Sequence, residues 1–181
     1  MSFLIQSNTG LRFGECRFLK WHYVSVVKGE NKYPNVHIRV PAEISKVRKD
    51  RTSVGMRGDF FTRIRTYSYH THSDDYIFSD MQTGKYLDKK VLYKMWHLIM
   101  KESGLEESLN DYTYYCLRHT FATYRLQYGK VDIRTLAKVM GCSVTYIEQH
   151  YDSARGENMT DYITRGGNEK SKDAVRDVML R

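Results

Sequence analysis

Residues 115–151 read YCLRHTFATYRLQYGKVDIRTLAKVMGCSVTYIEQHY and predict three successive helices. In the first helix, which Arg118 opens, four apolar residues recur at helical spacing and predict the stripe that faces a core: Leu117, Phe121, Tyr124 and Tyr128. A different face of the same helix carries Arg118, Ala122 and Arg125. We therefore expect this helix to bury one side and to present its arginines on another.

Two shorter helices are predicted within the same stretch. Asp132 is placed to cap the second helix and Gly141 to end it. The apolar stripe of this helix comprises Ile133, Leu136, Ala137 and Met140. Ser143 or Thr145 can start the third helix, and Thr145 with Glu148 fits a capping box.

Three ordered motifs in the chain carry a family resemblance. LRHTFAT (117–123), a Gly-x-Ser turn (141–143) and Tyr151 near the end of the following helix resemble the catalytic domain of tyrosine recombinases, the phage integrase family. Upstream, TGLRFGE (9–15) resembles the family's first-arginine motif. The resemblance extends from about Thr9 to Tyr151, and three motifs in order are more specific than any one of them.

The segments before these helices predict a small sheet and further helices. Three stretches rich in β-branched and aromatic residues predict antiparallel strands: Phe18–Val27, Val36–Val40 continued by Pro41–Ser45, and Thr52–Met56. Helices are predicted before Thr9, over Asp59–Tyr69 and, capped by Asp88, over Val91–Ser103 with Leu92, Met95, Trp96 and Ile99 as its stripe. The expected fold class is α+β, a mainly helical catalytic domain with a three-stranded antiparallel sheet on one side.

Composition and charge narrow the class of protein. The 181 residues are 41% hydrophobic with only 2 Pro, which argues against a disordered or fibrous chain. No apolar run is long enough to span a bilayer. The formal net charge of +8 makes a polyanion the natural partner. Three cysteines without paired spacing indicate a reducing compartment and neither a disulfide framework nor a zinc site, so no metal or other cofactor is expected.

The resemblance assigns the chemical roles at the site. Breaking a DNA phosphodiester without metal or ATP requires a covalent nucleophile, and Tyr151 matches the family's nucleophile. Arg12 and Arg118 match the two arginines that hold the phosphate oxygens through bidentate, permanently charged groups. Lys46 matches the lysine that protonates the leaving 5′ oxygen, with Lys49 as the alternative.

A basic turn between the second and third predicted strands adds further phosphate ligands. Those expected on the DNA backbone are Arg48, Lys49 and Arg51 in the turn, together with Arg125 in the helix that Arg118 opens. Double-stranded DNA is thus the expected partner.

Two positions depart from the family pattern. Tyr115 stands where the family usually has a histidine or lysine, and Cys142 stands where it usually has a histidine or tryptophan. Tyr115 keeps a hydrogen-bond donor but cannot act as a cationic acid, and Cys142 is a weak donor and a small apolar group. The neighbouring His119 and His150 point about 100° away on their helices and are not expected to substitute simply.

Three readings of function remain open on the sequence. The first is a site-specific recombinase that attacks DNA through Tyr151. The second is a catalytically impaired or inactive DNA-binding module of the same fold, and the third is a basic helix-turn-helix regulator with accidental motifs. Type IB topoisomerases share the chemistry, but the compact motifs resemble the integrase pattern more closely.

The expected organisation is one catalytic domain over residues 1–155, truncated at its start because the first-arginine motif arrives at Arg12, and a flexible tail over residues 156–181. The resemblance implies that the tail docks on a neighbouring protomer. It also implies a tetramer on DNA, with a monomer expected in its absence, no membrane association, and a cytoplasmic, nucleoid-associated location.

Overall fold

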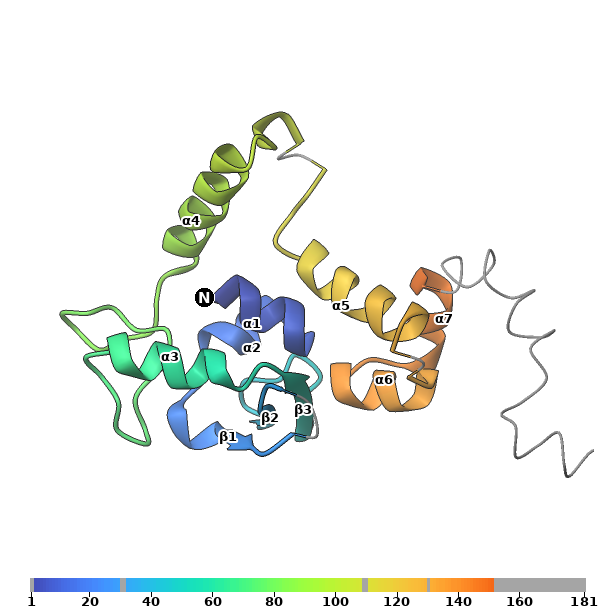
Figure 1. The fold of residues 1–181 in the computed structure, drawn as a ribbon, viewed down its shortest axis with the longest axis horizontal. Helices are drawn as coiled ribbons and strands as arrows, with labels where there is room; N and C mark the ends of the chain where they lie inside the picture. Colours follow the sequence, from blue (N-terminus) through green and yellow to red (C-terminus); the bar gives the residue numbers. More distant parts are fainter. Residues whose placement is uncertain (1, 30–31, 109–110, 130, 152–181) are drawn as a thin grey trace, which may run out of the picture.

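The computed structural model describes residues 2–29, 32–108, 111–129 and 131–151. The first half of this structure is built around a three-stranded antiparallel sheet in the order β1-β2-β3. Its elements are α1 (Ser2–Thr9), α2 (Phe13–Arg17), the 3-10 turn η1 (Trp21–Tyr23), β1 (Val24–Val27), β2 (Asn35–Val40), β3 (Arg51–Met56) and α3 (Asp59–Tyr67). The second half contains α4 (Lys89–Glu102), the 3-10 turn η2 (Glu106–Ser108), α5 (Cys116–Gln127), α6 (Ile133–Met140) and α7 (Val144–Tyr151). The α+β fold class predicted from the sequence is therefore confirmed (Figure 1).

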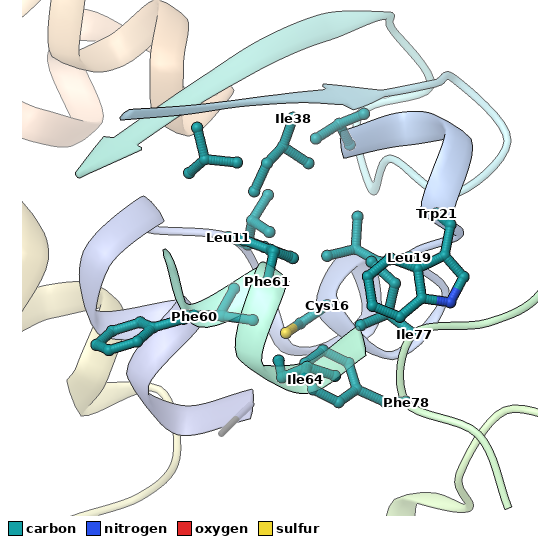
Figure 2. Packing of buried hydrophobic residues seen from close by; sticks show 13 residues of the cluster. Leu11, Cys16, Leu19, Trp21, Ile38, Phe60, Phe61, Ile64, Ile77 and Phe78 are labelled. Atoms are coloured by element: carbon teal, nitrogen blue, oxygen red, sulfur yellow. The ribbon is translucent and has the colours of Figure 1, made fainter. Parts of the chain in front are cut away.

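The inner face of the sheet forms the main core with α2 and α3. Alternate residues of β2 are fully buried, namely Val36, Ile38 and Val40, as expected for a strand with one face on a core. They pack with Leu11 and with Phe60, Phe61 and Ile64 of α3, and Figure 2 shows this cluster. The core thereby fixes α2, which follows directly after Arg12, against the sheet.

Two strand predictions were too long. Residues 18–23 were expected in the first strand, but Phe18 to Lys20 link α2 to η1, and Trp21 is buried with its Nε1 donating to the main-chain oxygen of His70 over 2.9 Å. Pro41–Ser45 was expected to extend the second strand and instead forms a turn, in which the Ser45 N–H donates to the oxygen of Pro41 over 3.1 Å. Burial of individual aromatic side chains and local turn hydrogen bonds outweigh strand propensity here.

Helix α1 joins the sheet to the second half of the molecule. It contacts β3 on one side and α5 on the other, and α6 also packs against β3 (Figure 1). Gly10 ends α1 in the left-handed region at φ 64°, and the Phe121 ring of α5 lies so close that a side chain at Gly10 would clash with it. This close approach places the Gly10 oxygen beside α5.

The predicted stripes of α4 and α5 are only partly correct. In α4, Leu92 and Trp96 are buried, but the predicted Met95 and Ile99 are 45% and 42% exposed. In α5, Phe121 is buried, but Tyr124 and Tyr128 are 59% and 69% exposed. The buried face of α5 is instead formed by Arg118, Phe121, Ala122 and Leu126, because α1 and α6 pack on the face that carries the arginine.

The ends of α6 match the prediction, and the start of α7 matches it in part. Asp132 caps α6 by accepting the N–H of Thr135 at 3.0 Å, and Gly141 ends it at φ 65°, both as predicted. Ser143 caps α7 by accepting the N–H of Tyr146 at 3.1 Å. Thr145 lies inside α7, so the capping box predicted for Thr145 and Glu148 is wrong.

None of the helices in the described residues is long and apolar enough to cross a membrane. The tail predicted over residues 156–181 lies outside the described residues.

Candidate active site

Arg12 connects the start of α2 to the turn between α6 and α7. Its Nη1 donates to Oε1 of Glu15 over 3.0 Å, and its main-chain N–H donates to the other carboxylate oxygen over 2.8 Å. Its Nη2 donates to the main-chain oxygen of Gly141 over 2.6 Å. The guanidinium is thus held beside the residue that precedes Cys142.

Glu15 is the acidic partner of two arginines. It is 1% exposed, and Arg51 at the start of β3 donates to both of its carboxylate oxygens, over 2.9 and 2.7 Å. Burial by itself raises the Glu15 pKa, but the hydrogen bonds and charges of Arg51 and Arg12 outweigh it, and the net shift is downward. Glu15 is therefore an ionised carboxylate inside the protein.

Arg118 lies at the centre of the site and is fully buried. Its Nη1 donates to the oxygen of Gly10, and its Nη2 donates to the oxygen of Met140 over 2.8 Å. Burial and then the nearby charge of Arg12 lower the pKa of Arg118. A guanidinium has five N–H donors, and these two bonds use only two of them. The Nε of Arg118 has no hydrogen-bond partner among the described residues.

Tyr151 is the last described residue and ends α7 against α5. It is 2% exposed, and its hydroxyl is buried without a partner in the described part of the chain. Burial, followed by the nearby Tyr146 and Tyr115, raises the Tyr151 pKa, while the charge of Arg118 lowers it by less. The hydroxyl is therefore protonated in this conformation, and the Tyr151 ring lies 5.3 Å from the ring of His119, the residue that follows Arg118.

Tyr115, Tyr146 and Cys142 surround the same region. The hydroxyls of Tyr115 and Tyr146 lie 3.4 Å apart, and this contact is the main reason that the Tyr146 pKa rises to about 12. Burial raises the Cys142 pKa, which the charges of Arg118 and Arg12 partly offset. The two positions that depart from the family pattern thus both lie beside Arg118.

Two histidines also lie at the site, His119 one helical turn after Tyr115 and His150 one turn after Tyr146. The His119 ring packs 5.3 Å from the Tyr151 ring, and the His150 ring stacks on Tyr146 at 4.0 Å. Burial, and then the charges of His150 and Arg118, lower the His119 pKa. His119 is a residue that sequence reasoning set aside, although its four-residue spacing from Tyr115 would have placed both on one helix face.

The loop between β2 and β3, residues 41–50, carries the lysines. Lys46, Arg48 and Lys49 are exposed. A groove of about 710 Å³ lies between this loop and the α6–α7 turn, and its lining includes Lys49, Gly141 and Cys142 but not Lys46. Of the two loop lysines, Lys49 is therefore the one that shares this groove with Cys142.

Two arginines expected on the DNA backbone are engaged elsewhere. Arg51 is held by Glu15 and also donates from Nε to the oxygen of Val139 over 3.1 Å. The Arg125 guanidinium lies 5.4 Å from the Phe121 ring centre, in a groove between β3 and α6 that is separate from the one beside Cys142. The structure thus brings Arg12, Tyr115, Arg118, Cys142 and Tyr151 together and leaves Arg125 outside the cluster.

Similar proteins support one family. A sequence model of the phage integrase family matches residues 1–157. The tyrosine recombinase XerC of Caldanaerobacter subterraneus subsp. tengcongensis is 41% identical over 78 residues, which cover 41% of this chain and 19% of the relative.

Solved structures show the same fold. XerH recombinase in a post-cleavage complex with its difH substrate aligns with a TM-score of 0.65 and 20% identity, over 91% of this chain and 44% of that one. XerA recombinase aligns with a TM-score of 0.63 and 24% identity, over 91% of this chain and 57% of that one. The Tn1549 transposon integrase with circular intermediate DNA aligns with a TM-score of 0.54 and 22% identity, over 86% of this chain and 55% of that one.

The chain therefore spans about a fifth of the matched XerC and roughly half of each solved structure. The family match covers most of the chain and includes every residue of the cluster around Arg118. On these grounds the chain belongs to the phage integrase family.

Proposed function

We propose that this chain is the catalytic part of a site-specific DNA recombinase, which cuts and rejoins DNA strands through a 3′-phosphotyrosyl intermediate on Tyr151 without metal or ATP. The observation that carries the proposal is the convergence of Arg12, Arg118 and Tyr151 from three distant parts of the chain. Membership of the phage integrase family supports it. The DNA complexes of XerH and of the Tn1549 integrase support double-stranded DNA as the partner.

In the proposed reaction the Tyr151 hydroxyl gives its proton to solvent water and forms a bond to phosphorus, while the bond from phosphorus to the 5′ oxygen breaks. The 5′ oxygen receives a proton from Lys46, or from Lys49, which lines the groove beside Cys142. Arg12 and Arg118 stabilise the negative charge that develops on the non-bridging oxygens. Because the phosphotyrosyl bond conserves the energy of the broken one, a 5′ hydroxyl of another strand can reverse the attack and complete an exchange.

The described conformation is closed with respect to this reaction. The Tyr151 hydroxyl and the Arg118 guanidinium are both sealed from solvent, so a phosphate cannot contact either of them. For the reaction to start, α7 must move relative to α5 and release the hydroxyl. We propose that DNA engages the exposed loop residues Lys46, Arg48 and Lys49 as α7 opens, and that the active assembly on DNA is a tetramer of otherwise monomeric chains in the nucleoid.

A second candidate is a catalytically impaired DNA-binding module of the same fold. The observation that favours it is the pair of departures from the family pattern, since Tyr115 cannot act as a cationic acid and Cys142 is only a weak hydrogen-bond donor. This candidate predicts DNA binding without a covalent intermediate.

The test is covalent trapping on nicked duplex DNA, in which a short strand diffuses away after cleavage and leaves the protein attached. Wild type and Tyr151→Phe are compared on denaturing gels, with DNA that includes the sequences flanking the gene. A shifted band that depends on Tyr151 supports the recombinase. Persistent DNA binding without any band, also in a longer chain that carries an added N-terminal DNA-binding domain, supports the binding module instead.

A further inference from the structure

We propose that Arg51 is a positioning residue of this site, which holds Arg12 in place through the carboxylate of Glu15 and makes no contact with DNA phosphate itself. The inference rests on the proposed function, because that function gives the Arg12 guanidinium its role. It replaces the expectation, drawn from the basic turn alone, that Arg51 is a phosphate ligand.

The geometry of the Glu15 carboxylate is the first argument. Arg51 binds it with two parallel bonds, from Nη1 to Oε1 over 2.9 Å and from Nη2 to Oε2 over 2.7 Å. Arg12 uses the same two oxygens, from Nη1 over 3.0 Å and from its main-chain N–H over 2.8 Å. The carboxylate therefore cannot rotate without breaking bonds to both arginines, and Arg51 fixes the group that orients Arg12.

The Arg51 side chain also passes over the α6–α7 turn. Its Nε donates to the oxygen of Val139 over 3.1 Å. Its Cδ and Nε lie 2.7 Å from the position that a Cβ of Gly141 would occupy. Because Arg12 donates to the Gly141 oxygen, both arginines hold the same turn, and Arg51 sets how closely it approaches α2.

Accessibility is the third argument. The Arg51 side chain is 8% exposed, whereas Arg48 and Lys49, three and two residues before it, are exposed to solvent. A phosphate contact by Arg51 would have to break a bidentate bond to a carboxylate that is 1% exposed. An unpaired buried carboxylate is costly, so the exchange is unfavourable.

The charged and titratable groups that face Glu15 come from every element around it. They are Arg12 before α2, Cys16 within α2, Arg51 from β3 and Arg118 from α5. Arg51 is the largest favourable contribution to the ionised form, because its hydrogen bonds and charge lower the Glu15 pKa more than those of Arg12. Removal of Arg51 would leave burial as the dominant effect and raise that pKa.

The first measurement is the salt dependence of DNA affinity, which needs no catalysis. Each phosphate contact contributes about 0.9 to the slope of log K against log salt for duplex DNA. The measurement is made in an Arg12→Met background, so that any effect of Arg51 that passes through Arg12 is already absent. In this background Arg51→Met and Arg51→Lys are expected to leave the slope unchanged. Arg48→Met, the matched control three residues away, is expected to lower it by about 0.9. A loss of about 0.9 for Arg51→Met in that background would overturn the proposal.

The second measurement is the rate of covalent trapping. Arg51→Lys keeps the charge but loses the bidentate geometry, and a misplaced Arg12 is expected to slow trapping on the order of 100-fold. In a Glu15→Gln background the same change is expected to alter the rate less than about threefold, since coupled residues act as a unit. If Arg51→Lys slows trapping by the same factor with and without Glu15→Gln, Arg51 does not act through Glu15.

The pH profile separates positioning from a general loss of structure. Arg51→Met is expected to move the acid limb of the trapping rate to higher pH, because Glu15 then protonates more easily. A uniform loss at every pH, in a variant whose circular dichroism matches wild type, would overturn the proposal. A wild type without any covalent band would reject the proposed function, while the salt slopes would still decide the role of Arg51.

Discussion

Arg118 donates from Nη2 to the main-chain oxygen of Met140 over 2.8 Å, and so the second arginine of the site is bonded to the end of α6. The next main-chain oxygen, that of Gly141, accepts the Arg12 guanidinium over 2.6 Å. Two consecutive carbonyl groups of one helix end therefore gather both arginines. Cys142 follows directly, and under the proposed function the geometry of the α6–α7 turn sets where the two arginines would hold a phosphate.

Arg118→Lys is expected to slow covalent trapping by about 10²- to 10³-fold, the cost of one preorganised donor to a developing oxyanion. A lysine cannot donate to the Gly10 and Met140 oxygens and to a phosphate at once, because it lacks the planar fork. The rate on nicked DNA measures the effect. Arg63→Lys, at an exposed position of α3, is the control and should react as wild type. A wild-type rate for Arg118→Lys would exclude Arg118 from transition-state stabilisation.

Gly141→Ala is expected to destabilise the protein more than Gly104→Ala. Both glycines have positive φ, 65° and 70°, so each substitution costs about 1–2 kcal/mol of backbone strain. A Cβ at Gly104 meets nothing within 4 Å, whereas one at Gly141 meets Arg51 at 2.7 Å. The clash is expected to add about 1–3 kcal/mol. Urea unfolding of the two variants measures the difference, and equal midpoints would mean that Arg51 yields without cost.

Tyr115→His is expected to raise the trapping rate about tenfold or more, and more at pH 6 than at pH 8. An imidazole with a pKa near 6.5 is largely cationic at pH 6 and supplies the acid–base group that a neutral phenol lacks. Tyr115→Phe is the matched control, and it should react no faster than wild type because it removes the hydroxyl that contacts Tyr146. If the histidine variant is no faster at either pH, the tyrosine is not what limits this site.

Tyr151→Phe is expected to reduce the loss of stability above pH 10. Burial raises the folded-state pKa of Tyr151 above the unfolded value of about 10. The folded protein therefore holds this proton more tightly, and the stability linked to it is present below pH 10 and is lost as pH rises beyond it. The difference in the free energy of unfolding between wild type and Tyr151→Phe should change by up to about 1.4 kcal/mol per pH unit above pH 10, as measured by urea titration. Tyr67→Phe, at a residue that is 79% exposed, should not change the slope, and a wild-type slope for Tyr151→Phe would mean that the hydroxyl is accessible.

Local patterns in the sequence correctly predicted those helix ends that are defined by residues a few positions away. Asp132 and Gly141 mark the limits of α6 because a cap and a left-handed stop act within a few residues. The strand over Asn35–Val40 follows from clean alternation. The stripe of α5 could not be predicted in the same way, because α1 and α6 pack on the arginine face and leave Tyr124 and Tyr128 in solvent.

The sequence by itself determined the family and the order of the motifs, and it predicted the roles of Arg12, Arg118 and Tyr151, since these depend on residue types at fixed spacings. Only the tertiary structure decided what each arginine touches. Arg51 belongs to a basic turn that resembles a phosphate-binding surface, yet the fold brings it to Glu15, 36 residues away, where a buried carboxylate requires a cation. Local sequence carries no information about such a distant partner, because the electrostatic cost of burial arises only when the chain has folded.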